Sequence, residues 1–297
     1  MIENILKNDR RTIAKALTLV ESTSQNDQTE KENLISKLLD KQNGNCIVVG
    51  FSGITGSGKS SLIEEMGKIL LKDNKKVAVL AIDPSSPIHG GSILGDKTRM
   101  NFLSTHENCF VRPVPSKFNN GGISRSTHES IVIFKAAQYD YIFIETVGVG
   151  QTEYSVSEVS DCLIVNLLPA TGDELQGVKK GINEVADIIL INKCDGALET
   201  QAQITVNEYQ KTLSKPILAT SIFKNDTVEK ILIELEKFLT NNKKTISERR
   251  MNQMKKWGQK LAIIELQNLI LSSEMEYNFK NPYEIKKSIL KSIRKSH

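Results

Sequence analysis

Cys46-Ile-Val-Val-Gly-Phe51-Ser-Gly53-Ile-Thr-Gly-Ser-Gly-Lys59-Ser60 is the stretch of sequence that decides the fold. Its first part is a short apolar run of the kind that forms a buried strand, and its second part fits the G-x-x-x-x-G-K-S pattern of a phosphate-binding loop. The pattern stands where its chemistry requires it, between the strand ending at Phe51 and a helix expected to begin near Lys59. We therefore expect a P-loop α/β fold.

The glycines of this loop allow the backbone to curl around phosphate and to aim its N–H groups inward. The positive N-terminal end of the following helix adds to the attraction. We expect Lys59 to neutralise charge on the β- and γ-phosphates and the Ser60 hydroxyl to bind Mg²⁺. The residues of the loop expected to contact nucleotide are Gly53, Thr55, Gly56, Ser57, Gly58, Lys59, Ser60 and Ser61.

Further short apolar runs alternate with helical or glycine-bearing segments, which predicts a mostly parallel central sheet flanked by helices. These predicted strands are residues 77–82, 141–144, 163–165, 188–191 and 216–220. Residues 2–39 carry apolar side chains at helical intervals, interrupted at 22–28, and we read them as two helices. Helical spacing returns from Met254 through Trp257 to Ile270. The predicted organisation is an N-terminal helical extension (1–43), a nucleotide-binding domain (44–242) and a C-terminal helical arm (243–297).

An acidic residue should close a strand on the metal side of the site, and Tyr141-Ile-Phe-Ile-Glu145-Thr-Val-Gly148 supplies one. An acid after a strand is otherwise often an ordinary solvated carboxylate. Here Gly148 follows at the spacing of a GTPase switch segment, in which the glycine N–H senses the γ-phosphate. This spacing favours a functional role for Glu145.

The run at 188–191 leads directly into Asn192-Lys193-Cys194-Asp195, an N-K-x-D signature at a strand end. Asp195 can accept hydrogen bonds from N1–H and the exocyclic amine of guanine, and adenine presents no such pair. The signature therefore favours GTP over ATP. Ser221 follows the last predicted strand and is expected to steady the base through its backbone, although Ile222 departs from the usual Ser-Ala pair.

Composition narrows the class of protein. The 297 residues are 39% hydrophobic and 25% charged, as in globular proteins, and the 5% aromatic content gives little support to base stacking on nucleic acid. The net charge of +4 comes largely from residues after Lys243, which we read as a solvated helical face rather than as a contact for RNA or an acidic protein. Without a secretory signal or a membrane-spanning run, we expect a cytoplasmic protein that binds neither nucleic acid nor membrane.

Cysteine and histidine positions argue against a disulfide framework or a zinc site. The four cysteines are far apart, and the four histidines lack ligand spacing. Buried, reduced thiols are therefore expected at Cys46, Cys109, Cys162 and Cys194.

Several segments between these motifs are not required by P-loop chemistry in general. They are Asp83-Pro-Ser-Ser86, the glycine-rich stretch 90–100 with Asp96, Arg112-Pro113, Gly121-Gly122, residues 145–151 and residues 172–181. Together they resemble the MeaB/ArgK family of SIMIBI-class P-loop GTPases, the chaperones of adenosylcobalamin-dependent methylmalonyl-CoA mutase. The resemblance covers roughly residues 45–225.

The resemblance implies roles for residues that spacing alone would not single out. Asp83, Asp96 and Glu145 would join Ser60 in the Mg²⁺ shell, and Lys59, Asp96, Glu145 and Lys179 would serve catalysis. The segment around 172–179 would be a third mobile switch, whose Lys179 communicates with the mutase. No catalytic base is assigned, because Gln151 does not directly follow Gly148 as the water-positioning glutamine of small GTPases does.

The implied function is a GTPase, converting GTP to GDP, that gates cofactor loading and protects or reactivates an acyl-CoA mutase. The family's C-terminal arm implies a homodimer, in which Trp257 would be a subunit contact, with packing inside one chain as the alternative. Two rival functions are an ArgK-like, transport-associated kinase that uses ATP and a metallochaperone GTPase. An intact phosphate site disfavours a pure scaffold.

Overall fold

The computed structural model describes residues 1–24, 26–83, 100–115, 125–146, 152–169 and 185–272, and residues 283, 284, 286, 289 and 290 beyond them. The chain divides into two compact units, Met1–Arg249 and Arg250–His297. The sheet lies in the first unit. The sequence boundaries at 43 and 242 stay a prediction.

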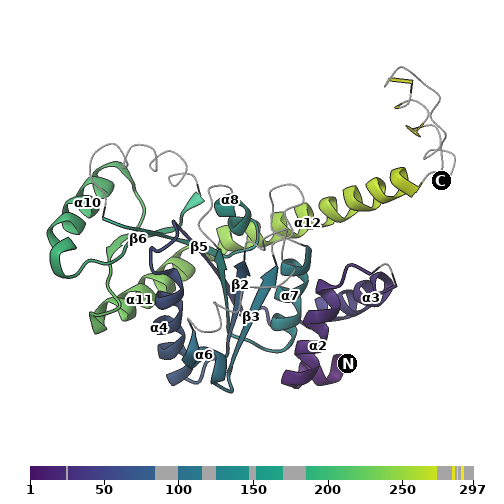
Figure 1. Cartoon of the computed structure of the whole chain (residues 1–297), viewed down its shortest axis with the longest axis horizontal. Coiled ribbons are helices and arrows are strands. Elements are labelled where there is room, and N and C mark those ends of the chain that lie inside the picture. Colours follow the sequence, from purple (N-terminus) through teal and green to yellow (C-terminus); the bar gives the residue numbers. More distant parts are fainter. Residues whose placement is uncertain are drawn as a thin grey trace. The chain divides into compact units, whose positions relative to one another are not determined.

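The described strands of the first unit form one seven-stranded, wholly parallel sheet in the order β3-β2-β4-β1-β5-β6-β7 (Figure 1). This confirms the predicted parallel α/β architecture. The strands are β1 (Ile47–Ser52), β2 (Val77–Asp83), β3 (Cys109–Pro115), β4 (Tyr141–Thr146), β5 (Cys162–Leu167), β6 (Ile188–Ile191) and β7 (Ile217–Ala219).

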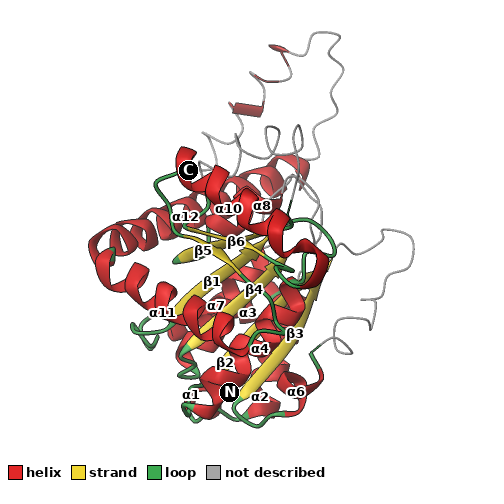
Figure 2. Ribbon diagram, turned by 90° about the vertical axis from the view of Figure 1, so that its left-hand side faces the viewer, coloured by secondary structure: helices red, strands yellow, loops and turns green. Residues whose placement is uncertain are grey.

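Helices cover both faces of the sheet, and Figure 2 shows the strands between them. Helices α4 (Lys59–Lys72), α6 (Asn101–Thr105) and α11 (Asn225–Asn241) contribute to an apolar core with one face of the central strands. Helix α8 (Thr152–Ser157) packs on β1 and β4, and α7 (Arg125–Ala136) packs against the N-terminal helices. The other described helices that lie wholly in this unit are α1 (Ile2–Leu6), α2 (Arg10–Glu21), α3 (Gln28–Leu39), the short 3-10 helix η1 (Gly196–Leu198) and α10 (Glu199–Thr212).

All six strands predicted from apolar runs are present, and the sequence interpretation missed β3. This strand contains Arg112, Pro113 and Pro115, which interrupt its apolar pattern. Proline lacks an N–H and is tolerated at a sheet edge. Strand β3 is such an edge, because β2 is its one neighbour among the described strands. The two helices predicted before residue 40 are three in the described structure, since α1 is separate from α2.

Ion pairs attach the N-terminal helices to the rest of the first unit. Arg112 on β3 forms a bidentate pair with Glu21 at the end of α2. Arg125 at the start of α7 pairs with Glu32 of α3 at 3.3 Å. Within α7, its Nε also donates to Glu129 at 2.7 Å, and the Glu129 side chain is only 2% exposed. Burial raises the pKa of Glu129 despite the opposing effect of Arg125. This carboxyl group therefore keeps its proton to a higher pH than an exposed glutamate does.

Helix α12 (Lys243–Ser272) begins inside the first unit. Its Arg249 donates two hydrogen bonds to the Asp187 carboxylate, at 2.7 and 2.9 Å, and a third to the Asp161 carbonyl at 2.9 Å. Asp161 and Asp187 directly precede β5 and β6, so Arg249 fixes the start of α12 to the amino ends of these two neighbouring strands.

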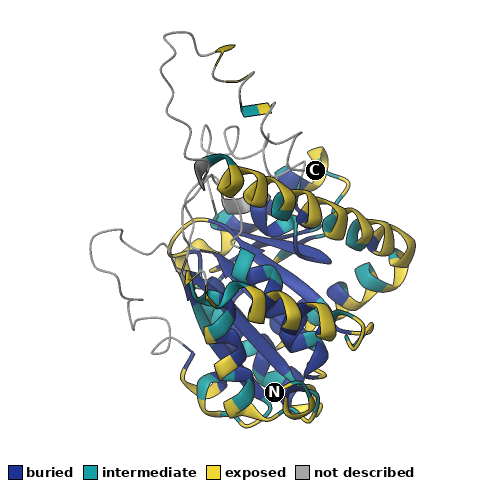
Figure 3. Ribbon diagram, turned by 90° about the vertical axis from the view of Figure 1, so that its right-hand side faces the viewer, coloured by how far each residue is buried: buried dark blue, intermediate teal, exposed yellow. Residues whose placement is uncertain are grey.

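In the described residues, the strands are mostly buried and the outer faces of the helices are exposed. Figure 3 shows buried strands in dark blue beneath helices with exposed outer faces. All four cysteines are buried and free, which confirms that prediction. Across the ranges described above, no helix has both the length and the apolar character needed to cross a membrane.

Candidate nucleotide-binding site

The predicted phosphate loop lies at the carboxyl end of β1. Strand β1 lies between β4 and β5, and from it the chain builds the sheet outward in both directions, so the loop stands at a topological switch point. Ligands of open α/β sheets bind at such a switch point. Two glycines are required by close approach as well as by conformation. Gly53 has φ +133°, and a Cβ there would lie 2.0 Å from the Asn166 carbonyl oxygen. Gly58 has φ +90°, and its Cβ would lie 2.5 Å from Nδ2 of Asn192.

Helix α4 begins at Lys59, as predicted. The Lys59 side chain is 6% exposed, and its ammonium donates to the carbonyl oxygens of Gly53 at 2.7 Å and Ile54 at 3.0 Å. The positive charge is thus held over the loop itself, beside the N-terminal end of the helix. Of the other loop residues, Thr55 and Gly56 are exposed, Ser57 is buried, and Ser60 and Ser61 are half-buried.

Two predicted metal-side residues meet across the site. The Ser60 hydroxyl donates to Oε1 of Glu145 at 2.6 Å, and Glu145 is the last residue but one of β4, with 8% of its surface exposed. A hydroxyl oxygen and a carboxylate oxygen are donors that suit Mg²⁺. Asp83 ends β2 in register with Pro115, but its side chain and all of Asp96 lie outside the described residues. The described part of the predicted metal shell therefore consists of Ser60 and Glu145.

The Ser57 carbonyl oxygen receives hydrogen bonds from two buried carboxamides. Nδ2 of Asn192 lies 2.7 Å from it and Nδ2 of Asn166 lies 2.9 Å from it. Asn192 belongs to the predicted base signature and Asn166 to β5. The loop is consequently tied to two strands beyond its own.

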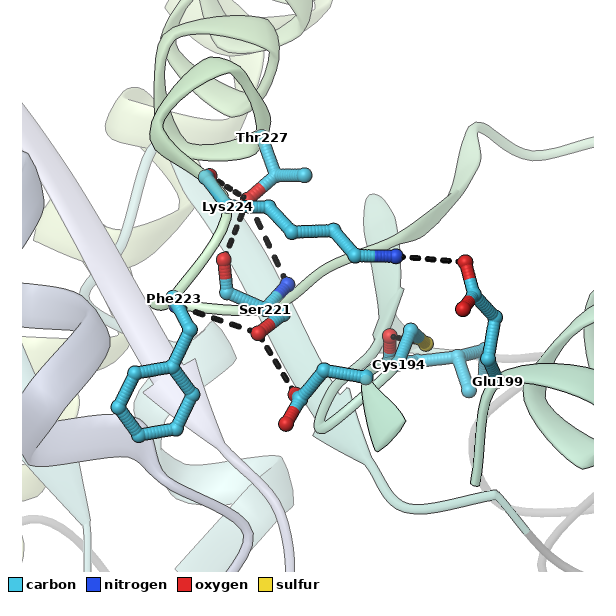
Figure 4. Close-up of polar contacts among 8 residues, drawn as sticks. Cys194, Glu199, Ser221, Phe223, Lys224 and Thr227 are labelled. Carbon is cyan, nitrogen blue, oxygen red and sulfur yellow. Dashed lines mark hydrogen bonds and ion pairs between the residues drawn. The ribbon is translucent and has the colours of Figure 1, made fainter. Parts of the chain in front are cut away.

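Hydrogen bonds join the two predicted base-recognition segments, residues 192–195 and residues 220–222. The Ser221 hydroxyl donates to Oδ1 of Asp195 at 2.6 Å, which fixes the orientation of a half-buried carboxylate (Figure 4). Thr227 in turn donates to the Ser221 carbonyl at 2.6 Å. Thr220 donates to Oδ1 of Asn192 at 3.2 Å, and Lys193 is exposed with φ +60°. The arrangement presents an oriented carboxylate, which suits the amide-like edge of guanine.

An ion pair closes the outer side of this arrangement. Nζ of Lys224 lies 2.7 Å from the Glu199 carboxylate, and Figure 4 shows it spanning the two segments. Both side chains are well exposed, at 40% and 65%, so water screens the pair and it contributes little to stability.

Sequence reasoning missed Asn166, Thr220 and Thr227 as parts of the site. Asn166 carried a signal, because it is a carboxamide within an otherwise apolar strand, and a buried polar side chain needs a partner. Thr220 and Thr227 are ordinary residues for a strand end and a helix start. The predicted positions Asp96, Gly148 and Lys179 lie outside the described residues.

The pattern of a family described as "Methylmalonyl Co-A mutase-associated GTPase MeaB" matches residues 13–275. The chain belongs to the MeaB family. It is similar to a probable GTPase of Mycobacterium tuberculosis, with 46% identity over 67% of this chain and 59% of that protein. It is 45% identical to the GTPase ArgK of Escherichia coli over 71% of this chain and 64% of that protein. The chain thus aligns with about three fifths of the length of these MeaB relatives.

A mitochondrial protein of Caenorhabditis elegans, named methylmalonic aciduria type A homolog, is 38% identical over 86% of this chain and 70% of that protein. Among solved structures, one titled LAO/AO transport system kinase matches with a TM-score of 0.76 and 29% identity, covering 99% of this chain and 96% of that chain. HypB of Helicobacter pylori, solved with nickel, has a TM-score of 0.51 at 19% identity, covering 73% of this chain and 97% of that one. The likeness to HypB shows a shared fold alone.

Proposed function

We propose that this MeaB-family protein is a Mg²⁺-dependent GTPase that converts GTP and water to GDP and phosphate. The observation that carries the proposal is the pairing of Asp195 with Ser221 beside a complete phosphate loop. An ionised carboxylate held by a hydroxyl can accept hydrogen bonds from guanine N1–H and the exocyclic amine. Adenine offers no matching donor pair and leaves the carboxylate unpaired, which is costly in a half-buried site.

The residues of the loop supply the electrostatics of phosphoryl transfer. Lys59 and the inward N–H groups would stabilise the charge that develops on the transferred phosphoryl group. Ser60 and Glu145, joined by the 2.6 Å hydrogen bond, are the described residues that would hold Mg²⁺. A bound ion would supply positive charge to offset the charge of the phosphate oxygens. Asp83 and Asp96 complete this metal set in the proposal.

The proposed partner is an adenosylcobalamin-dependent acyl-CoA mutase of the methylmalonyl-CoA mutase type. The family description, which names an association with that mutase, supports this step. The protein would act in the cytoplasm as a chaperone that gates cofactor loading and protects or reactivates the mutase. Lys179 would relay the state of the nucleotide to the mutase, and the C-terminal helices would pair two copies as a homodimer. The proposal involves neither nucleic acid nor membrane.

A kinase is the second candidate, because the LAO/AO structure bears that name at 29% identity. A kinase would transfer phosphoryl from ATP to another protein. Comparing hydrolysis of GTP with that of ATP by the purified chain separates the two functions. We expect GTP turnover to exceed ATP turnover clearly, and to be lost in Lys59→Ala. Equal use of both nucleotides, with labelled phosphate appearing on a protein acceptor, would favour the kinase.

The partner is tested by measuring GTP turnover with and without the adenosylcobalamin-dependent mutases of the host. We expect one of them to accelerate hydrolysis. Lys179→Ala should retain the basal rate and GTP affinity but lose most of that acceleration, since the nucleotide-binding residues are unchanged. An unresponsive wild-type protein would contradict the chaperone function, whereas a fully responsive Lys179→Ala variant would contradict the switch role alone.

A further inference from the structure

Asn166 lies against the phosphate loop at two points, Gly53 and Ser57. Its carbonyl oxygen lies 2.0 Å from where a Cβ of Gly53 would be, and its carboxamide donates to the Ser57 carbonyl at 2.9 Å. Asn166 itself is completely buried. We propose that Asn166 is a positioning residue that fixes the Ser57–Gly58 peptide so that the Gly58 N–H points at bound phosphate. This role rests on the proposed nucleotide site.

Peptide geometry connects the Asn166 contact to the phosphate. In a planar trans peptide, the C=O and the following N–H point in opposite directions. The Ser57 carbonyl is held toward the two carboxamides, so the Gly58 N–H must point away from them. Gly58 has φ +90°, a conformation in which glycine meets little resistance to rotation of the adjoining peptide. A carbonyl held by two donors opposes that rotation.

The carboxamides of Asn166 and Asn192 are held in place by different parts of the fold. Asn192 follows β6 and shares its carboxamide with Thr220 of the base-recognition segment, so it connects the base to the loop. Asn166 lies inside β5, in register with Leu190 of β6, and its strand also pairs with β1. Asn166 is therefore the fixed support, which holds the peptide whether or not a base is bound.

Burial argues that the Asn166 carboxamide serves positioning rather than packing. Its Oδ1 is buried and has no hydrogen-bond partner among the described residues. An unsatisfied buried polar atom is destabilising, and a leucine of similar volume would avoid it. The hydrogen bond to Ser57 is what the carboxamide provides and leucine cannot.

The test compares the affinities of GDP and GMP for the full chain by competition against a fluorescent guanine nucleotide. The β-phosphate is the group the loop holds, so the ratio of the two affinities reports on the loop. We expect Asn166→Leu to lower this ratio about tenfold, the effect of one lost hydrogen bond to a charged group, with GMP affinity changed less than about twofold. Asn166→Ala should give the same result if the leucine does not fit.

Val165→Ala is the matched control, because Val165 is the neighbouring buried residue of β5 and points to the opposite face of the sheet. It should reduce thermal stability while leaving the GDP/GMP ratio unchanged. An unchanged ratio in both folded Asn166 variants would overturn the positioning role but leave the proposed GTPase intact. A wild-type chain that binds neither GDP nor GMP would overturn the proposed function and this role with it.

Discussion

The hydroxyl of Ser60 donates to the carboxylate of Glu145 over 2.6 Å, joining the first turn of α4 to the end of β4 across 85 residues of chain. Both side chains reach the carboxyl edge of the sheet, where the strand ends converge. The contact brings together two oxygen donors that the sequence predicted for Mg²⁺.

Removing either member of this pair should impair hydrolysis more than nucleotide binding. For Ser60→Ala and Glu145→Gln we expect GTP turnover to fall by about 100-fold or more, because electrostatic stabilisation of the transferred phosphoryl group depends on Mg²⁺. The Mg²⁺ concentration for half-maximal rate should rise. Glu65→Gln, on α4 with a partly exposed side chain, is the control. Unchanged Mg²⁺ dependence in both variants would contradict the metal assignment.

The Asp195–Ser221 contact predicts a graded change in base selectivity. Asp195→Asn should weaken GTP binding and improve binding of xanthosine triphosphate, whose base carries a carbonyl in place of the amine. Ser221→Ala should reduce the preference for GTP over ATP by about fivefold, since the carboxylate loses its orienting donor. Competition binding measures both, with Glu199→Gln as a nearby surface control. A Ser221→Ala protein with full selectivity would show that Asp195 needs no such support.

Arg249 predicts a stability effect distant from the nucleotide. Its three hydrogen bonds serve the Asp187 carboxylate and the Asp161 carbonyl, and its removal leaves a largely buried carboxylate at Asp187 without them. We expect Arg249→Ala to lower the free energy of unfolding by about 2 kcal/mol. Arg249→Lys should recover part of this. Urea denaturation measures the free energy of unfolding of each variant. If the Asp187→Asn/Arg249→Ala double variant loses as much unfolding free energy as the two single variants together, the two side chains do not interact.

Glu129 predicts the direction of a pH effect on stability. Burial raises its pKa above the ordinary value of 4.5, so the folded protein holds this proton to higher pH than the unfolded chain does. The stability that Glu129 contributes is therefore fully present below pH 4.5 and is lost as pH rises through its folded pKa. Unfolding free energies of the wild type and Glu129→Gln should diverge in favour of the glutamine variant across this window. Parallel pH profiles would contradict the raised pKa.

The proposed homodimer predicts that exposed apolar side chains of α12 are subunit contacts. Ile263, Leu266 and Leu269 are 53%, 44% and 45% exposed in the single chain, whereas Trp257 is 7% exposed. Changing those three residues to glutamine should shift a dimer to a monomer in sedimentation. Ile233→Gln on α11, where the side chain is 52% exposed, should leave the assembly unchanged. A wild-type protein that sediments as a monomer would contradict the proposed pairing of two copies through the C-terminal helices.

Periodicity and motifs predicted most of this fold for a physical reason. Buried parallel strands are apolar on both faces, so β1 and β6 stand out as uninterrupted runs, and the loop at Gly53 follows a fixed pattern. Strand β3 was not predicted because prolines, which an edge strand tolerates, interrupt its apolar pattern. The sequence marks Asn166 only as a polar side chain within an apolar run, and its role was missed because its partner Ser57 lies 109 residues earlier in the chain.

That separation also bears on how the protein is made. The carboxamides that hold the Ser57 carbonyl lie 109 and 135 residues further along the chain. A nascent chain that has left the ribosome through β1 and α4 already contains the whole phosphate loop, but neither group that orients it. Competence to bind GTP should therefore arise late in synthesis, after β6 has emerged, and incomplete chains should not sequester the nucleotide.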